Sequence, residues 1–469
     1  MKKHLILLIF SFSLAALWAQ QPSPGGIDGA WQWWRPQSTN TQQHYWQMGA
    51  ERLPYAASES VLLNHWPSPN WLMLSQPPVL ELSAGMGNAA TLFIVYQPPA
   101  DNKEEVLWSW QRGNQPPLVS TNKRLADLHK RHYLNFLHEQ HATRLQTYRH
   151  AEGNTQDGNT LFGFGQLTTP ASIPAGQWAA PIAEFIFYPY LLEPTEQLQV
   201  ESHLALKYGT TLGTPGQGSN YLSSTGLLLW DAEQNQDFHH RIFGLGRDDA
   251  SGWQQGRSHS AEAPELVTLS LSGSPAQNGL EELPIPDQHF CLIGDDAAAL
   301  EWVDIADADG EVLDRKWLVQ FTGDFSEFLT DIQFDLGRWL GSDIDAFEYS
   351  ILVDADASNG FQAAEAEHFT MTSLQKGRFG QFEGIHWRSS TQAIFTLARR
   401  PIATSQTGLT ALRVYPNPLA ENKAWQWQLR LPTDTDLSVQ LTNAKGQQLW
   451  QRHYTTSSYF AAEERPLPA

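Results

Sequence analysis

Residues 182–213 read IAEFIFYPYLLEPTEQLQVESHLALKYGTTLG, and this stretch decides how the chain is organised. Its first seven residues are almost all apolar, as in a strand covered on both faces, and Pro189 ends that strand because proline cannot donate to a sheet. Pro194 then suits the first turn of a helix, and Gly209 suits the left-handed residue that closes one. The stretch therefore predicts a buried strand, a short amphipathic helix, and a domain boundary at the Gly- and Pro-rich residues 213–219.

The composition limits the possible functions. The chain has 469 residues, with 30 Lys and Arg against 50 Asp and Glu, and a single cysteine, Cys291. The formal net charge of −20 makes the chain a poor candidate for nucleic-acid binding, which needs a basic surface, and one cysteine excludes an internal disulfide. Aromatic residues make up 12% of the chain and charged residues 17%, which, with many Gly and Pro, favours an all-β protein with long turns.

The amino terminus has the pattern of an export signal. A short basic segment precedes an apolar run over residues 5–17, and Ala19 is a small residue that suits cleavage. The run is shorter than the roughly 20 residues that a membrane-spanning helix needs. We therefore expect a signal peptide at residues 1–19, no transmembrane span, and a protein that is secreted or held on the outer cell surface.

The chain after the signal alternates between strand candidates and turns. Residues 20–26 are rich in Gly and Pro, and we interpret them as a flexible lead. The strand candidates that follow have the regular spacing of a β-sandwich. Residues 123–141 could also form a helix, but Tyr133, Asn135 and Leu137 alternate with their neighbours as strand residues do.

Several segments of the first half of the chain carry a family resemblance. A Gly-Gly-Ile lead, a Trp-rich first strand, TLFIVYQP at residues 91–98, and LALKYG at residues 204–209 follow one another. This order resembles the laminin-G-like, concanavalin-A-like sandwich of secreted gram-negative proteins that use type IX secretion. Arg35 and Pro36 depart from the family, in which an acidic residue soon follows the first-strand tryptophan. The resemblance implies a jelly-roll sandwich over residues 25–213 that ends in a short helix, and an interaction module more often than an enzyme.

Residues 220–400 predict a second all-β domain, built like a sandwich. Strand candidates follow one another here without a long helical period. YLSSTGLLLWD at residues 221–231 and RIFGLGRDDASGWQQGRS at residues 241–258 resemble the domain that commonly follows the laminin-G-like unit. The resemblance implies no activity for this domain.

The last part of the chain carries another resemblance. LRVYPNP at residues 412–418 is followed by strand candidates and by Asn-Ala-Lys-Gly at residues 443–446. This arrangement resembles the sorting domain of type IX secretion cargo, in which Tyr-Pro-Asn-Pro opens a small β-sandwich. The resemblance implies a sorting domain over residues 409–469, with the type IX secretion machinery as a partner. The chain stops at residues 467–469, where the family has a further strand, so we expect the domain to be truncated.

Catalytic patterns are missing from the sequence. It contains neither the Glu-x-Asp-x-x-Glu run of glycoside hydrolases with this fold nor a Gly-x-Ser-x-Gly elbow nor a phosphate-binding loop. His138 and His141 are spaced one residue too closely for a zinc motif, and on a strand they would face opposite sides. We therefore predict no catalytic or cofactor-binding residues and a protein that is not an enzyme.

One acidic segment is the best candidate for an ion site. Asp354, Asp356, Ser358 and Glu365 supply oxygen atoms at positions 1, 3, 5 and 12, as in a calcium loop. The glycine of this segment falls one position later than an EF-hand requires. We predict that these four residues bind calcium, with a solvated acidic turn as the alternative.

Two further features of the first domain bear on function. Glu184 is the one charge in the predicted buried strand, so it needs a partner, and we expect a structural arginine rather than a catalytic role.

Exposed tryptophan rings can stack on sugars, although most should belong to the core. The tryptophans of this domain include Trp31, Trp33, Trp34, Trp66, Trp71, Trp108, Trp110 and Trp178.

These features together predict a secreted or cell-surface, non-enzymatic protein. Its laminin-G-like domain would bind a glycan or a surface protein, in a role such as adhesion. Two alternatives remain open: a polysaccharide-acting hydrolase with an unrecognised site, and a purely structural component of the surface or matrix. An open face with exposed tryptophans would favour binding, whereas two converging carboxylates would favour hydrolysis.

Overall fold

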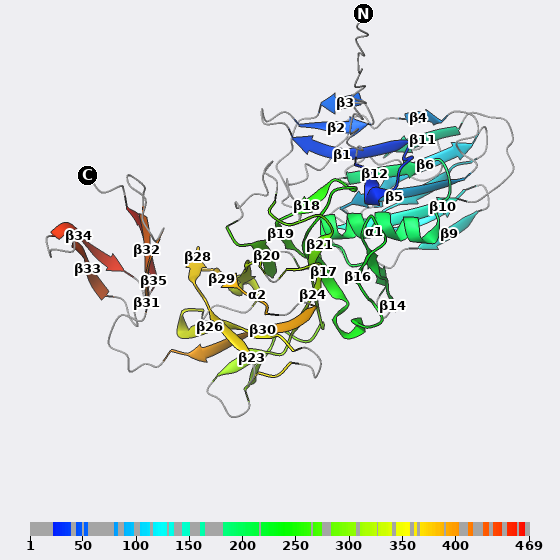
Figure 1. The fold of residues 1–469 in the computed structure, drawn as a ribbon. Helices are drawn as coiled ribbons and strands as arrows, with labels where there is room; N and C mark the ends of the chain where they lie inside the picture. Colours follow the sequence, from blue (N-terminus) through cyan, green and yellow to red (C-terminus); the bar gives the residue numbers. More distant parts are fainter. Residues whose placement is uncertain are drawn as a thin grey trace, which may run out of the picture.

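The computed structural model describes most of the chain after the predicted signal. With shorter gaps inside some of them, the described ranges are residues 22–38, 44–54, 79–150, 160–164, 182–402 and 411–464. Antiparallel strands make up most of these ranges (Figure 1), so the predicted all-β class is confirmed. In this part of the chain, none of the helices is both long and apolar enough to cross a membrane.

Two sheets of the first part of the chain pack face to face and form what we call the first sandwich. One sheet has the order β10 (Arg144–His150), β5 (Ala90–Tyr96), β12 (Ile182–Tyr188), β1 (Gln32–Ser38), β2 (His44–Met48) and β3 (Glu51–Pro54). The other has the order β4 (Val79–Leu82), β11 (Thr160–Phe164), β6 (Val106–Arg112), β7 (Leu118–Thr121), β8 (Arg124–Asp127) and β9 (His132–Asn135). The strand interpretation of residues 123–141 is thus confirmed where the segment is described, and His138 and His141 lie outside the described residues.

The strand that opens the deciding stretch is β12, and it is buried along its whole length, as predicted. Its neighbour β5 is buried in the same way. Phe185 and Phe187 of β12 point into the first sandwich, whereas Ala183 and Ile186 point to the opposite face. A helix covers that opposite face, which explains why the sequence of β12 lacks a polar side.

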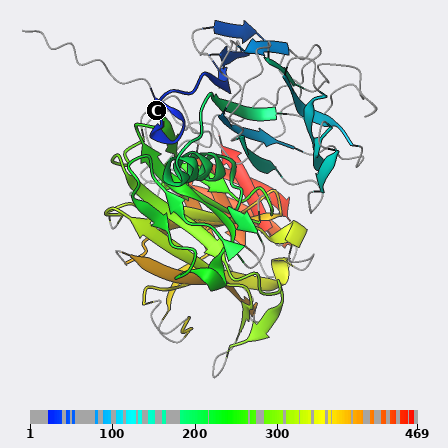
Figure 2. The ribbon, with the colours of Figure 1, turned by 90° about the vertical axis from the view of Figure 1, so that its right-hand side faces the viewer.

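That helix, α1 (Pro194–Tyr208), begins and ends where the sequence predicts. Pro194 occupies its first turn, and Gly209 closes it in the left-handed conformation with φ of 62°. Val200, Leu204 and Tyr208 pack on the outer face of the first sandwich, while Ala205 and Leu206 join a different core. The helix therefore lies between two bodies, as Figure 2 shows from the side.

The second body, which we call the second sandwich, spans β15 to β30. Its larger sheet has the order β18 (Trp253–Gln255), β17 (His240–Asp248), β21 (His289–Asp295), β24 (Trp317–Thr322), β30 (Gln392–Pro401), β23 (Glu311–Leu313) and β22 (Trp302–Asp304), with β26 (Phe347–Asp354) pairing with β30 and β27 (Glu367–Thr370) pairing with β26. Its smaller sheet has the order β19 (Arg257–His259), β20 (Val267–Leu271), β25 (Thr330–Asp335), β29 (Phe379–Ile385) and β28 (Ser373–Gln375).

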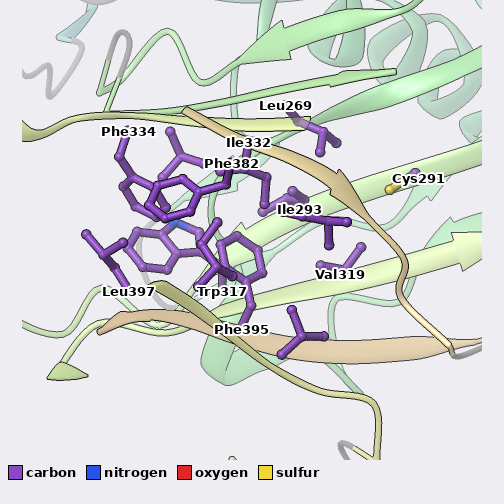
Figure 3. Packing of buried hydrophobic residues seen from close by; sticks show 14 of the residues in the cluster. Leu269, Cys291, Ile293, Trp317, Val319, Ile332, Phe334, Phe382, Phe395 and Leu397 are labelled. Carbon is purple, nitrogen blue, oxygen red and sulfur yellow. The ribbon is translucent and has the colours of Figure 1, made fainter. Parts of the chain in front are cut away.

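The core of the second sandwich is rich in aromatic rings (Figure 3). Trp317 lies 5.4 Å from both Phe334 and Phe395, measured between ring centroids, edge-on to the first and stacked on the second. Cys291 is completely buried in this core, and burial raises the pKa of its thiol. A buried thiol with a raised pKa is a structural residue rather than a nucleophile.

Shorter elements lie before, between and within these bodies. They are β13 (Gly213–Thr214), β14 (Gln217–Gly218), β15 (Tyr221–Leu222), β16 (Leu228–Trp230), α2 (Leu336–Trp339), and the 3-10 turns η1 (Pro24–Gly26), η2 (Gln236–Phe238) and η3 (Ile344–Ala346). The last part of the chain contributes a sheet of β31 (Ala411–Tyr415), β32 (Trp425–Arg430) and β35 (Tyr459–Glu464), and a pair of β33 (Thr435–Thr442) and β34 (Gln448–Thr456).

The amino-terminal lead differs from its prediction. The sequence predicts a flexible lead over residues 20–26, but Pro24–Gly26 forms η1, and Pro24 and Gly25 are buried against α1. The expectation fails because glycine and proline permit two outcomes, a mobile chain or a tightly packed turn that no larger residue can form.

Candidate functional site

Glu184 lies in β12 on the face that α1 covers, and its side chain is completely buried. Its carboxylate accepts hydrogen bonds from Nε1 of Trp33 at 2.5 Å, Nζ of Lys207 at 2.5 Å and the hydroxyl of Tyr208 at 2.7 Å. Trp33 belongs to β1, and the other two donors belong to the last turn of α1. One carboxylate thus fastens the helix to two neighbouring strands.

The surroundings of Glu184 keep it ionised. Burial alone would raise the pKa of Glu184, but the charges of Lys207 and His203 and the hydrogen bonds from Lys207 and Trp33 outweigh burial and lower the pKa to about 2. The predicted arginine partner is wrong, because the end of α1 lies directly over β12 and brings a lysine and a tyrosine into reach. Its described partners include no second carboxylate, which a retaining glycosidase would require.

The described tryptophans of the first sandwich belong to its packing. Trp108 and Trp110 are at most 3% exposed, Trp31 packs edge-on against Phe187, and Trp33 is tied to Glu184. The side chain of Trp34 and all of Trp66, Trp71 and Trp178 lie outside the described residues. The described tryptophans therefore form a core and not an open groove.

Trp302 in β22 is a partly exposed tryptophan of the second sandwich. The guanidinium of Arg399 lies 4.2 Å from the centroid of the Trp302 ring and 4.1 Å from that of the Phe347 ring, and its Nε donates to Glu311 at 2.7 Å. These cation–π contacts place the guanidinium against one face of each ring. The cluster thus joins β22, β23, β26 and β30 and leaves those ring faces closed to a sugar.

The predicted calcium segment is described only in part. Asp354 is buried at the end of β26, and its two carboxylate oxygens accept the backbone N–H groups of Asp356 at 3.0 Å and Gln362 at 2.7 Å. Ser358 and Glu365 lie outside the described residues. The described residues contain no group of three or more His, Cys, Asp or Glu side chains arranged for a metal. Calcium binding stays a prediction, and the two amide contacts are those of an acidic turn.

A set of polar side chains on the outer side of the smaller sheet of the second sandwich is the candidate site, and we call it the polar face. In β25, Thr330, Ile332 and Phe334 are buried, whereas Asp331 and Gln333 between them are half-exposed. This alternation is the period of a strand with one face on a core and the other towards solvent. The polar face consists of Arg257, His259, Ser270, Asp331, Gln333, Gln381 and Glu383, together with Thr268, which lies on the same side of the sheet but is buried.

Strand register arranges these side chains in two rows across the sheet. One row pairs His259 with Thr268, Thr268 with Gln333, and Gln333 with Gln381. The other pairs Arg257 with Ser270 and Ser270 with Asp331. Residues paired in this way have Cβ atoms about 5 Å apart, so each row lines up polar side chains across neighbouring strands. In the first row the accessible side chains are His259, Gln333 and Gln381, because Thr268 is buried.

Hydrogen bonds hold several of these side chains in place. The guanidinium of Arg257 donates to Oε1 of Gln333 at 3.2 Å. Oδ1 of Asp331 accepts from the hydroxyl of Ser272 at 2.5 Å and from the backbone N–H of Gly384 at 2.9 Å. Glu383, next to that glycine, is exposed. Guanidinium, amide, hydroxyl and carboxylate groups thus alternate on a rigid sheet, where they offer both donors and acceptors.

The polar face is not among the sites that the sequence predicts. Its signal is the alternation in VTLSL at residues 267–271, TDIQFD at residues 330–335 and FGQFEGI at residues 379–385. Alternation predicts that one side of each strand is polar, but it does not say which strands become neighbours. The rows exist only once β20 and β29 pair with β25.

Residues 196–390 are similar to a family described as a domain of unknown function, DUF8202. The matched region begins inside α1 and contains all strands of the smaller sheet, and with them the polar face. No curated protein matches the chain in sequence.

Solved structures overlap with the chain at low sequence identity and low TM-score. The binding domain of botulinum neurotoxin serotype C1 shares 7% identity with a TM-score of 0.25, over 80% of this chain and 99% of that one. The N-terminal CBM22-1-CBM22-2 tandem domain of Paenibacillus barcinonensis Xyn10C shares 8% identity with a TM-score of 0.16, over 80% of this chain and 90% of that one. Overlaps of this size do not establish a common fold.

Proposed function

We propose that this chain is a non-enzymatic binding protein of the outer cell surface and that its polar face binds a glycan. The apolar run at residues 5–17 and the resemblance of the first and last domains to type IX secretion cargo support export. The observation that carries the proposal is the pair of polar rows on the smaller sheet, because they combine fixed donors and acceptors on one side of a β-sheet, and all of their side chains except Thr268 are at least partly exposed.

The chemistry of the polar face favours a glycan over a protein ligand. Sugar hydroxyls both donate and accept hydrogen bonds, and they match the amides of Gln333 and Gln381, the guanidinium of Arg257 and the carboxylate of Asp331. Protein interfaces instead have an apolar and aromatic centre. The named side chains of the polar face are all polar, and Leu329, which is 45% exposed, lies just before β25 at one end.

The carboxylates of the polar face favour ligand binding over hydrolysis. Asp331 already accepts two hydrogen bonds through one oxygen, as a carboxylate that is held in place does. A hydrolase would need a second carboxylate that acts as an acid, and Glu383 is the nearest candidate along the pairing of β25 with β29. We propose that both residues bind ligand hydroxyls.

The test is a glycan array probed with the full chain, followed by calorimetric titration of the best ligand. The double variant Gln333→Ala, Gln381→Ala should lose affinity by about tenfold or more, since each amide contributes about 1 kcal/mol through its hydrogen bonds. Gln217→Ala is the matched control, because this exposed amide lies on β14, outside the polar face, and its loss should leave the affinity unchanged.

Two kinds of outcome would contradict the proposal, namely loss of the predicted binding behaviour and cleavage of the ligand. The first is an array without any bound glycan, or a double variant that binds as well as the unaltered chain. The second is shortening of the bound glycan during incubation, abolished by Asp331→Asn or Glu383→Gln, which would establish the hydrolase alternative.

A further inference from the structure

Residues 22–29, which we call the amino-terminal strap, pass over the joint between the two sandwiches. The strap precedes β1, contains the sequence PSPGGIDG, and includes the buried turn η1. Three different parts of the molecule contact it, namely the first sandwich, α1 and the second sandwich.

The first sandwich holds the strap through two tyrosines at the end of β12. The hydroxyl of Tyr188 donates to the carbonyl oxygen of Ile27 at 2.9 Å. The hydroxyl of Tyr190 donates to the carbonyl oxygen of Asp28 at 2.7 Å. The ring of Tyr188 is completely buried, so this side of the contact belongs to the rigid outer face of the sandwich.

The second sandwich holds the other end of the strap. The backbone N–H of Ser23 donates to the carbonyl oxygen of Ala250 at 3.0 Å, in the turn that follows β17. Ser224 lies beside Gly26, and α1 positions this serine because Nε2 of Gln199 donates to its carbonyl oxygen at 2.6 Å. The strap thus crosses from one sandwich to the other over the helix that they share.

Three glycines of the strap lie very close to neighbouring atoms. A Cβ on Gly25 would lie 2.7 Å from the backbone of Gln199 and Val200 in α1, and a Cβ on Gly26 would lie 2.5 Å from Cβ of Ser224. A Cβ on Gly29 would lie 2.6 Å from the hydroxyl of Tyr190. The contacts at Gly25 and Gly26 leave no room for a side chain, so the Pro-Gly-Gly turn fits the joint by shape.

We propose that α1, the turn at residues 223–224 and Ala250 form a groove whose occupant is the strap of the same chain, and that the seated strap locks the two sandwiches together. The backbone and the shape of the turn Pro24-Gly25-Gly26 carry the recognition, so the groove selects a turn without side chains at two successive positions. This site is distinct from the polar face and does not depend on the proposed ligand.

The decisive experiment compares Gly26→Ala with Gly273→Ala in the full chain. Both glycines have φ of +74°, so both substitutions strain the backbone equally, but a Cβ on Gly273 meets no atom within 4 Å. Hydrogen exchange at residues 22–31 and along α1 should become about tenfold faster in Gly26→Ala and should stay unchanged in Gly273→Ala. Equal exchange in the two variants would overturn the proposal.

A second experiment tests recognition of the strap in trans. A chain that lacks residues 22–29 should bind a synthetic peptide of residues 21–30 saturably, and the peptide should restore the slow exchange of α1. A peptide with Gly25→Ala and Gly26→Ala is the control and should not bind. Equal binding of both peptides, or binding of neither to a folded shortened chain, would overturn the proposal. If the shortened chain does not fold, the comparison of Gly26→Ala with Gly273→Ala in the full chain decides alone.

Discussion

Glu184 illustrates how one buried charge can join elements that are far apart in sequence. The carboxylate contacts Trp33 near the start of the first sandwich and Lys207 and Tyr208 at the end of α1. Removing one member of a buried ion pair leaves the other without compensation, which costs more than the pair itself contributes. We therefore expect this residue to act on stability and not on ligand binding.

The variant Glu184→Gln should lower the free energy of unfolding at neutral pH by about 3 kcal/mol. The folded-state pKa of about 2 lies below the ordinary value of 4.5. The stabilisation is therefore complete above a pH of about 4.5 and is lost as the pH falls towards 2, so the two proteins should converge over that range. Urea unfolding of both proteins across the range measures the difference.

Glu348→Gln is the control for this variant, because the pair of Glu348 with Arg400 is exposed and should be worth less than about 1 kcal/mol. A difference between Glu184→Gln and the unaltered chain that persists at the lowest pH would show that the carboxylate acts by packing rather than by charge.

The element that organises the molecule is α1, which contributes to two cores. Val200 and Leu204 pack on the first sandwich, and Ala205 and Leu206 pack on the second. The sequence predicts the helix because proline and glycine mark its ends and because Val200, Leu204 and Tyr208 repeat at helical spacing. It does not predict the second buried face, since Ala205 and Leu206 are also common on helices that are covered on one side only.

The same limit applies to the sheets. The strand β12 can be predicted because burial on both faces removes its polar residues, and the strands of the polar face can be predicted from their alternation. Their pairing order depends on contacts across many residues, such as that of Gln333 with Gln381. The partner of Glu184 could not be predicted for the same reason, since it depends on where the last turn of α1 comes to lie.

Alanine substitutions in α1 should distinguish its two faces. Leu204→Ala and Leu206→Ala should each lower the free energy of unfolding by about 2–5 kcal/mol, because both side chains are almost completely buried. Hydrogen exchange should rise mainly in β5 and β12 for the first variant and in β17 and β21 for the second.

Thr195→Ala is the control for these two variants, because this exposed residue of the same helix should change stability by less than about 0.5 kcal/mol. If Leu206→Ala raised exchange only within the first sandwich, the helix would not be a shared element.

At the scale of the whole molecule, the two sandwiches should unfold together. They share α1, and the strap crosses their joint, so neither can lose its core without exposing part of the other. We expect scanning calorimetry to give a single transition for the two sandwiches, and Leu206→Ala to shift that transition as a whole. Two separate transitions, of which only one responds to Leu206→Ala, would contradict the shared core.

The position of β1 has a consequence for synthesis. Gln32 of β1 pairs with Phe187 of β12, so the first strand to leave the ribosome has to wait for a partner that is made almost last within its sandwich. A nascent chain that ends at β11 can pair β5 with β10 on one edge, but it lacks β12 on the other edge, although all seven residues of β5 are buried in the finished protein. Such long-range pairing slows folding, and it makes the unfinished first sandwich a natural client for chaperones that bind apolar strands.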